Sequence, residues 1–287
     1  MNDCTGFEGR KMSVMRLMYI TNNPSVALIA EKNGVDRIWI DLEIEGKEER
    51  QKGKNTVKSK HCIKDILNIK PLLTTSQMLV RINPWSERSS KEIHDVMEAG
   101  ADVIMLPMWR TVEEVKGFIH AVNGKCKTLL LLETIDAEKA LDEVLKINGI
   151  DEIHIGLNDL HLEYKLPYMF ELLSNGKIEE ICNKIKPTGI PFGFGGIGMF
   201  GRGLIPTPEE IINEHFRLGS TALILSRSFC NYEQIGNLEE IDKIFSIGVK
   251  AVREQEKIAS GFTQDDFLKN KEIVCKGVEQ TMKQMRI

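Results

Sequence analysis

Short apolar runs recur along the chain and are separated by longer amphipathic stretches. Such runs, when they are bounded by polar residues, predict buried β-strands. The runs lie at residues 17–21, 37–43, 78–83, 102–108, 128–134, 152–159, 191–196 and 222–229. The stretches between them have apolar residues at helical spacing, and several end in glycine, as helix C-termini often do.

This alternation of strands and helices predicts a parallel sheet with helices outside it. Eight strand–helix units in about 250 residues predict a (β/α)8 (TIM) barrel. A doubly wound open sheet is the alternative that the pattern leaves open. We expect the barrel to form a catalytic domain at residues 1–257. Residues 258–287 should form a C-terminal helical extension, suited to pack on a partner subunit.

Polar residues fall repeatedly at the ends of the predicted strands. Asp41 and Glu43 end the second strand, and Arg81 ends the third. Glu133 ends the fifth strand, and Asp159 ends the sixth. Because the catalytic groups of parallel barrels lie at the C-terminal ends of the strands, these side chains should meet at one mouth.

The run "LLLLET" at residues 129–134 ends in a carboxylate, Glu133. Burying an unpaired charge costs several kcal/mol, so a nearby group should offset that cost. A hard divalent cation shared with Asp159 would do so, and Mg²⁺ and Mn²⁺ take oxygen ligands. Glu133 could instead cap a helix or pair with an arginine.

Arg81 ends an apolar strand, where a guanidinium can bind a carboxylate through two hydrogen bonds. Beside a metal ion, it would anchor a small 2-oxo acid whose carboxylate and keto oxygen bind the ion. Polarisation of the keto group would stabilise an enolate, which is the hard step in breaking the adjacent C–C bond. The alternative is a structural salt bridge from Arg81 to Asp41 or Glu43.

Composition limits the classes of function. The 287-residue chain is 42% hydrophobic and has a formal net charge of −4, which argues against binding to nucleic acid or to an anionic membrane. No apolar run reaches the roughly 18 residues that span a bilayer. The first residues are polar and the six cysteines are scattered, so we expect a cytoplasmic protein with reduced thiols.

The segment "LLLLETIDAEKALDEVLKINGIDEIHIGLNDL" resembles the metal-binding region of the HpcH/HpaI aldolase and citrate lyase family. "GADVIMLPM", "LVRINPWSE" and "IDLE" resemble its fourth, third and second strands. The resemblance implies a (β/α)8 barrel with a divalent metal (Mg²⁺ or Mn²⁺, with Co²⁺ possible) on Glu133 and Asp159. It also implies Arg81 on the substrate carboxylate, a pyruvate enolate, and a homo-oligomer that exchanges C-terminal helices between subunits.

One position departs from the family's pattern. Its class II pyruvate aldolases have a histidine after the acidic pair of strand two, where this chain has Ile44. The general base is therefore unassigned. His61 is a candidate, since the basic segment 46–61 could cover the mouth; it could also be an exposed histidine that opens the next helix. Lys47 and Arg50 could bind a phosphate or second carboxylate, or lie on a solvated face.

These observations predict a metal-dependent carbon–carbon lyase that cleaves or forms a 4-hydroxy-2-oxo acid. Asp41 and Glu43 would position waters or Arg81, and the turn of Gly156, Leu157 and Asn158 would contact the substrate. An acyl-CoA lyase or thioesterase of the citrate lyase beta type is an alternative, as is a barrel that binds a 2-oxo acid without turnover. We expect self-association as a dimer, trimer or hexamer.

Overall fold

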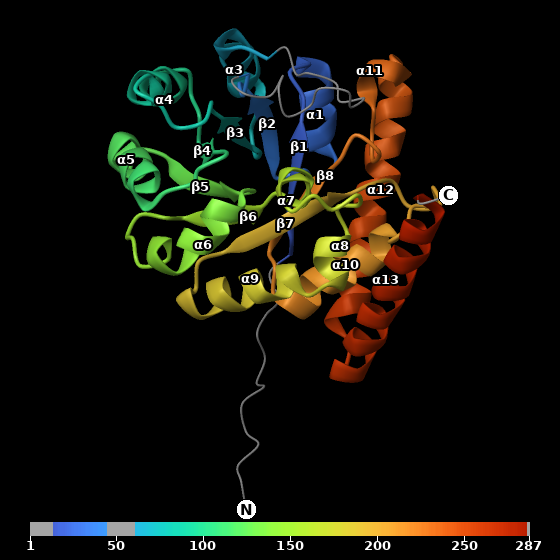
Figure 1. The fold of residues 1–287 in the computed structure, drawn as a ribbon. Helices are drawn as coiled ribbons and strands as arrows, with labels where there is room; N and C mark the ends of the chain where they lie inside the picture. Colours follow the sequence, from blue (N-terminus) through green and yellow to red (C-terminus); the bar gives the residue numbers. More distant parts are fainter. Residues whose placement is uncertain (1–13, 45–60, 286–287) are drawn as a thin grey trace, which may run out of the picture.

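Eight parallel strands form a closed barrel in the computed structural model, which describes residues 14–44 and 61–285 (Figure 1). The strands are β1 (Arg16–Ile20), β2 (Arg37–Asp41), β3 (Gln77–Arg81), β4 (Val103–Leu106), β5 (Lys127–Leu132), β6 (Glu152–Ile155), β7 (Phe192–Ile197) and β8 (Ala222–Leu225). Each strand pairs with the next along the chain, and β1 pairs with β8. The predicted barrel is confirmed, and the open sheet is ruled out.

Helices surround the strands and cover their outer faces (Figure 1). They are α1 (Pro24–Lys32), α3 (Ile63–Ile69), α4 (Ser89–Glu98), α5 (Val112–Val122), α6 (Ile135–Val144), α7 (Leu157–Glu163), α8 (Glu171–Ser174), α9 (Lys177–Ile185), α10 (Pro208–Leu218), α11 (Tyr232–Ile235), α12 (Leu238–Ser260) and α13 (Gln264–Met285), with 3₁₀ turns η1 (Lys70–Leu72) and η2 (Lys186–Thr188). Local signals set several of their ends. Thr207 caps α10 by accepting a hydrogen bond from Glu210 N–H, and Gly219 ends this helix in a left-handed conformation.

The inside of the barrel is a packed core. Its apolar layer contains Met18, Trp39, Leu79, Val103, Met105, Leu129, Leu131 and Ala222, all buried. These residues occupy alternate positions on their strands, as the period of two requires. The residues between them face outward and pack under the helices in a second, larger core.

An ion-pair network closes the N-terminal end of the barrel, and we call it the floor. Arg37 of β2 donates two hydrogen bonds of 2.6 Å to Glu152 of β6, and both side chains are buried. Arg16 lies 2.7 Å from the same carboxylate, and Gln77 accepts a hydrogen bond from Arg37 Nε. Because β2 and β6 are opposite strands in the closed order, the Arg37–Glu152 pair crosses the barrel.

The C-terminal helices lie on one side of the barrel, coloured orange and red (Figure 1). The expected boundary at residue 257 falls near the end of α12, which continues to Ser260 before α13 begins at Gln264. Helix α13 packs against α8 and α10 of its own chain and buries Val274, Val278 and Met282. The structure contains one chain, so exchange of this helix between subunits stays a prediction. In the described residues, no helix has the length and apolarity needed to cross a bilayer.

Candidate active site

Glu133 lies at the C-terminal end of β5, directly before helix α6. The following residue, Thr134, caps α6 by accepting a hydrogen bond from Ala137 N–H, so Glu133 is not the helix cap. The Glu133 side chain is 2% exposed. Within the described part of the chain its carboxylate forms no ion pair shorter than 4 Å. Among the described residues, Glu133 therefore neither caps a helix nor forms an ion pair with an arginine, which were the two alternatives to a metal ligand.

Two backbone features make room for Glu133 and orient it. Met108 N–H donates a 3.1 Å hydrogen bond to Glu133 Oε1, from a residue whose φ is 52°. A positive φ is uncommon for a residue with a side chain, and such strain occurs often at functional sites. A Cβ atom added to Gly156 would lie 2.8 Å from Glu133 Oε2 and 2.9 Å from its Cβ. Gly156 therefore belongs to the site because it leaves space for the carboxylate.

Asp159 lies in the first turn of α7, which begins directly after β6. A carboxylate there interacts favourably with the positive end of the helix dipole. Burial, followed by the negative charge of Asp159, raises the pKa of Glu133 well above its ordinary value of 4.5. Arg81 and the Met108 N–H lower the pKa of Glu133 but do not cancel this rise. The two acids predicted to share an ion therefore interact across the ends of adjacent strands.

Arg81 is held by the acidic pair of β2. The strand register places Asp41 beside Arg81, and Arg81 Nε and Nη2 each donate a 2.8 Å hydrogen bond to one Asp41 oxygen. Glu43 Oε2 lies 3.2 Å from Nη2, and the guanidinium lies 5.0 Å from the centre of the Trp39 ring. Burial acts to lower the pKa of Arg81, but the charges of Asp41 and Glu43 outweigh it. The pKa is therefore raised above its ordinary value, and Arg81 stays charged.

The salt bridge that the sequence left as an alternative is thus present, but it does not occupy the whole guanidinium. Among the described residues, Arg81 Nη1 makes no hydrogen bond, and the Arg81 side chain retains 11% exposure. A bidentate contact through Nε and Nη2 fixes the plane of the guanidinium. The arrangement is therefore compatible with a fixed cation that offers its third nitrogen to a ligand.

His61 lies at the same mouth, next to the end of β2. Asp41 N–H donates a 3.0 Å hydrogen bond to His61 Nδ1, and the ring is 9% exposed. His61 is therefore a buried residue beside the end of β2, and the alternative that it is an exposed histidine is wrong. Ile44, where the family's aldolases have histidine, is 65% exposed. Lys47 and Arg50 lie outside the described residues.

The other residues of the predicted substrate-binding turn are Leu157 and Asn158, and neither is placed against a side chain of the mouth. The Leu157 side chain is buried in the outer core, and a Cβ on Gly195 would lie 2.6 Å from it. Asn158 is exposed on the first turn of α7. Of the three-residue turn, only Gly156 is placed against a side chain of the mouth.

The residues at the mouth fit a divalent metal ion in charge and in ligand type. Two carboxylates offer the oxygen ligands that Mg²⁺ and Mn²⁺ prefer, and the raised pKa of Glu133 shows that the site disfavours its own negative charge. A cation between Glu133 and Asp159 would offset that charge. Among the described residues, no group of three or more His, Cys, Asp or Glu side chains is arranged to hold a metal. Water or substrate would have to supply the other ligands.

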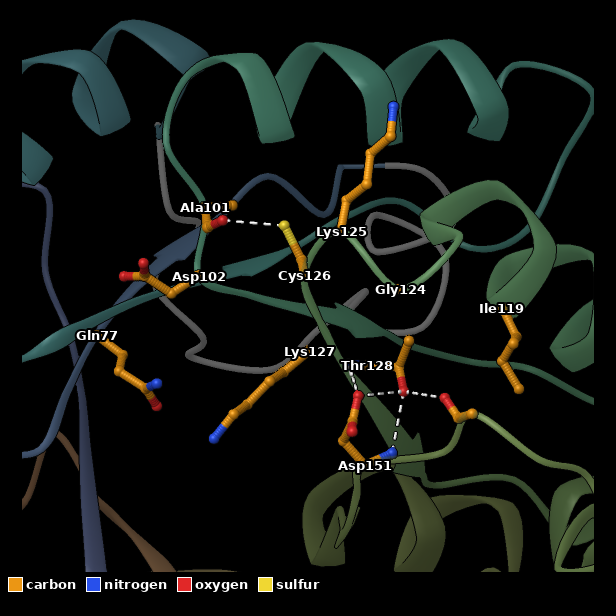
Figure 2. A pocket seen from close by; sticks show the side chains of 11 residues that line it. Gln77, Ala101, Asp102, Ile119, Gly124, Lys125, Cys126, Lys127, Thr128 and Asp151 are labelled. Carbon is orange, nitrogen blue, oxygen red and sulfur yellow. Dashed lines mark hydrogen bonds between the residues drawn. The ribbon is translucent and has the colours of Figure 1, made fainter.

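A hollow of about 490 Å³ lies away from these residues (Figure 2). It is lined by residues at or just before the starts of β3 to β6, among them Gln77, Asp102, Lys127 and Asp151. Asp102 is paired with Lys70, and Asp151 accepts hydrogen bonds from Thr128. The hollow is therefore at the N-terminal end of the barrel, opposite the mouth, and it contains none of the predicted site residues.

Solved structures share this fold at low sequence identity. The structure titled citrate synthase SbnG is 15% identical, has a TM-score of 0.58, and the match covers 80% of this chain and 94% of that chain. An HpcH/HpaI aldolase from Desulfitobacterium hafniense DCB-2 is 14% identical, with a TM-score of 0.57 and coverage of 78% and 91%. A HpcH/HpaI aldolase/citrate lyase family protein from Burkholderia cenocepacia J2315 is 12% identical, with a TM-score of 0.55 and coverage of 79% and 95%. At these identities the likeness shows the fold alone.

Comparison with curated protein sequences gives no match. The family model described as HpcH/HpaI aldolase/citrate lyase matches residues 16–171, from the start of β1 to the first residue of α8. This range is more than half of the chain and contains Asp41, Arg81, Glu133 and Asp159. The chain therefore belongs to the HpcH/HpaI aldolase/citrate lyase family.

Proposed function

We propose that this protein is a metal-dependent carbon–carbon lyase that cleaves or forms a 4-hydroxy-2-oxo acid through a pyruvate enolate. Family membership supports lyase chemistry in general. The observation that carries the finer proposal is the buried Glu133 carboxylate, whose pKa is raised by burial and by Asp159. A buried carboxylate with a raised pKa costs stability in its charged form, and a bound cation would offset that cost.

Glu133 and Asp159 would hold the ion, with Mg²⁺ or Mn²⁺ preferred and Co²⁺ also suited to the site. The family generally depends on a divalent metal. A bound cation would supply a Lewis acid for the keto oxygen of the substrate. The Met108 N–H and the space left by Gly156 hold the Glu133 carboxylate in one orientation, so the protein provides this ligand already positioned.

Arg81 would bind the substrate carboxylate through Nη1. Asp41 and Glu43 hold the other side of the guanidinium, so their role is to position Arg81. Because the Arg81 guanidinium is held in place before the substrate binds, little side-chain entropy is lost on binding. The same fixed charge would stabilise negative charge as it develops on the neighbouring keto group.

Exchange of deuterium from D₂O into the pyruvate methyl group tests the proposal. Wild-type protein with Mn²⁺ or Mg²⁺ should catalyse the exchange, and chelation should stop it. Glu133→Gln and Asp159→Asn should lose it while keeping the circular dichroism spectrum of the barrel. Asp142→Asn, which changes an exposed carboxylate of α6, is the matched control and should keep full activity. Exchange that survives both site variants would contradict the assignment.

The position of Ile44 favours a second candidate function. Ile44 stands where the family's aldolases have histidine and is largely exposed, so the chain could bind a 2-oxo acid without turnover. Such a protein would bind metal and pyruvate tightly but catalyse no exchange. The acyl-CoA lyase alternative depends on the basic segment 46–60, which lies outside the described residues. Assays with malyl-CoA and citramalyl-CoA against free oxo acids separate it from the aldolase.

A further inference from the structure

Glu163 is the last residue of α7, one turn after Asp159, and two local effects disfavour a carboxylate there. Its negative charge lies at the negative end of the helix dipole. Four residues separate it from Asp159, so two like charges share one face of a short helix, which also costs stability. Contacts between Glu163 and other segments must therefore offset these local costs.

Both oxygens of the Glu163 carboxylate bind groups outside α7. Oε2 accepts a 3.0 Å hydrogen bond from the backbone N–H of Ile135, and Oε1 accepts one from Arg110 Nη2. Ile135 is the first residue of α6, and the first N–H groups of a helix have no partner within that helix. A carboxylate at this place also lies at the positive end of the α6 dipole. Glu163 therefore joins the end of α7 to the start of α6.

Residues 108–110, which follow β4, are joined in the same way to residues 133–135 at the end of β5. The contacts are Met108 N–H to Glu133 Oε1 at 3.1 Å, Thr134 Oγ1–H to the Trp109 carbonyl oxygen at 2.9 Å, and Arg110 to Ile135 through the Glu163 carboxylate. Glu133 takes part in the first contact, and Glu163 takes part in the last. Glu163 is therefore tied to the two segments that hold Glu133 in place.

The pairing of β5 with β6 stops just before the two candidate metal ligands. Its last hydrogen bond joins Gly156 N–H to the Leu132 carbonyl oxygen at 2.9 Å. Glu133 follows Leu132 directly, and Asp159 follows Gly156 by three residues. Beyond this point, the contacts of Glu163 join α7 to the start of α6. They therefore limit how far the segments that carry Glu133 and Asp159 can separate.

We propose that Glu163 is a positioning residue, which together with Arg110 fixes the separation of the Glu133 and Asp159 carboxylates and so sets the metal affinity of the mouth. This inference rests on the proposed function and adds two residues to it. Two carboxylates that share one ion must lie at a fixed distance from each other, and groups that hold metal ligands in place therefore raise affinity. Neither Glu163 nor Arg110 contacts the ion or the substrate in this role.

The exposure of the pair argues against a role in overall stability. The side chains of Arg110 and Glu163 are 41% and 24% exposed, and exposed ion pairs contribute little to the free energy of unfolding. Tyr164 also donates a hydrogen bond to Glu138, which joins the same two helices farther along both. Loss of Glu163 should therefore leave the barrel folded and α7 packed. It should loosen only the ends of the helices that lie at the mouth.

Mn²⁺ binding, measured by titration calorimetry, tests the proposal. Glu163→Ala should weaken binding by about tenfold, the low end for residues that orient metal ligands, because Glu163 acts through the backbone. Glu163→Gln keeps an acceptor for Ile135 N–H but loses the charge that pairs with Arg110, so it should recover part of the affinity. Unchanged affinity in Glu163→Ala would overturn the proposal. No recovery in Glu163→Gln would overturn the link through Ile135.

Asp136→Asn is the matched control. Asp136 Oδ2 accepts a 3.0 Å hydrogen bond from Nη1 of the same Arg110, but Asp136 belongs to α6 and makes no link to α7. This variant should bind Mn²⁺ within about twofold of wild type, since it removes only an exposed ion pair. A loss equal to that of Glu163→Ala would assign the effect to the charge of Arg110 and overturn the positioning role of Glu163.

Deuterium exchange into pyruvate separates positioning from the loss of a ligand. At saturating Mn²⁺, Glu163→Ala should approach the wild-type rate, because both metal ligands remain. Its half-maximal rate should require about tenfold more Mn²⁺ than that of wild type. A purely structural role would lower the midpoint of urea denaturation without changing the Mn²⁺ requirement. That result, or loss of exchange at saturating Mn²⁺, would overturn the proposal.

The two proposals can fail separately. If the wild-type protein binds no Mn²⁺, the proposed function fails, and amide hydrogen exchange on the metal-free protein still decides whether Glu163 holds the Glu133 segment. The Met108 N–H, which donates to Glu133, should exchange faster in Glu163→Ala than in wild type, whereas the amides of β2 and β3 should be unchanged. Unchanged exchange at Met108 would show that Glu133 is held without Glu163 and would overturn the positioning role.

Discussion

The floor and the mouth of this barrel each contain a buried glutamate, on adjacent strands, but with opposite electrostatics. At the floor, burial acts to raise the pKa of Glu152, yet hydrogen bonds and charge from Arg37, together with Arg16, lower it below its ordinary value. At the mouth, burial and Asp159 raise the pKa of Glu133. Both carboxylates are almost fully buried, so burial alone does not decide the sign.

The difference lies in the neighbours. At the floor two arginines contact one glutamate, and the two Arg37–Glu152 hydrogen bonds are 2.6 Å long. At the mouth, Arg81 is the one arginine among the described residues that contacts the acidic side chains of the strand ends, and Asp41 and Glu43 engage it. Direct hydrogen bonds from Arg37 hold the Glu152 carboxylate in place, whereas Glu133 receives no hydrogen bond from an arginine among the described residues. The contrast indicates a structural role for the floor, and it agrees with the binding role that we propose for the mouth.

The largest expected effect is on stability, at the floor. Glu152→Gln leaves Arg37 buried without its counter-ion and should lower the free energy of unfolding by about 3–5 kcal/mol. Urea denaturation measures this value, with Glu113→Gln on the exposed face of α5 as control. Because the folded pKa of Glu152 is lowered, its contribution is present above the ordinary value of 4.5 and is lost as the pH falls through the folded pKa. A loss that is the same at low pH would contradict the pairing.

An intermediate effect is expected from Gly156→Ala at the mouth. The added methyl would meet Glu133 Oε2 at 2.8 Å and should displace the carboxylate, at a cost of about 1–3 kcal/mol in unfolding free energy. Titration calorimetry with Mn²⁺ should show affinity about 10- to 100-fold weaker than in wild type. Gly261→Ala serves as control, because φ there is −94° and the added Cβ would make only an ordinary contact, 3.5 Å from Ile258 O. Unchanged Mn²⁺ affinity in Gly156→Ala would separate Gly156 from the site.

The smallest expected effect is a gain in stability from Glu133→Gln at the mouth, opposite in sign to the loss expected from Glu152→Gln at the floor. Glu133→Gln should raise the unfolding free energy of the metal-free protein by about 1 kcal/mol near pH 8, since it removes a disfavoured charge. For a raised pKa, the stabilisation of the protonated form is full below the ordinary value of 4.5 and disappears as the pH rises through the folded value. The gain from glutamine should therefore shrink toward pH 4. Destabilisation near pH 8 would mean that Glu133 has a counter-ion.

Sequence patterns were sufficient for the architecture and for the residues that end its strands. Strand–helix alternation predicted the barrel, and position at strand ends brought Asp41, Arg81, Glu133 and Asp159 to one mouth. These inferences succeed because they depend on local periodicity and on one rule about parallel strands. Neither requires knowledge of which residues meet across the barrel.

Contacts between distant segments were not predictable in the same way. The Arg37–Glu152 pair joins residues 115 positions apart across the barrel, and nothing in either strand marks the partner. The His61 contact to Asp41 N–H likewise joins residues 20 positions apart. Met108 was missed because its contribution is a backbone conformation. An alternation of apolar residues in "DVIMLPM" gives no signal for a left-handed residue.

The backbone conformation of Met108 has a consequence for protein engineering. Because the amide, and not the thioether, contacts Glu133, libraries that randomise position 108 can alter the wall of the barrel without removing this contact. Glycine and asparagine are the substitutions that tolerate a φ of 52° most readily. Proline is the one residue to leave out of such a library, since it lacks the N–H and cannot adopt that angle.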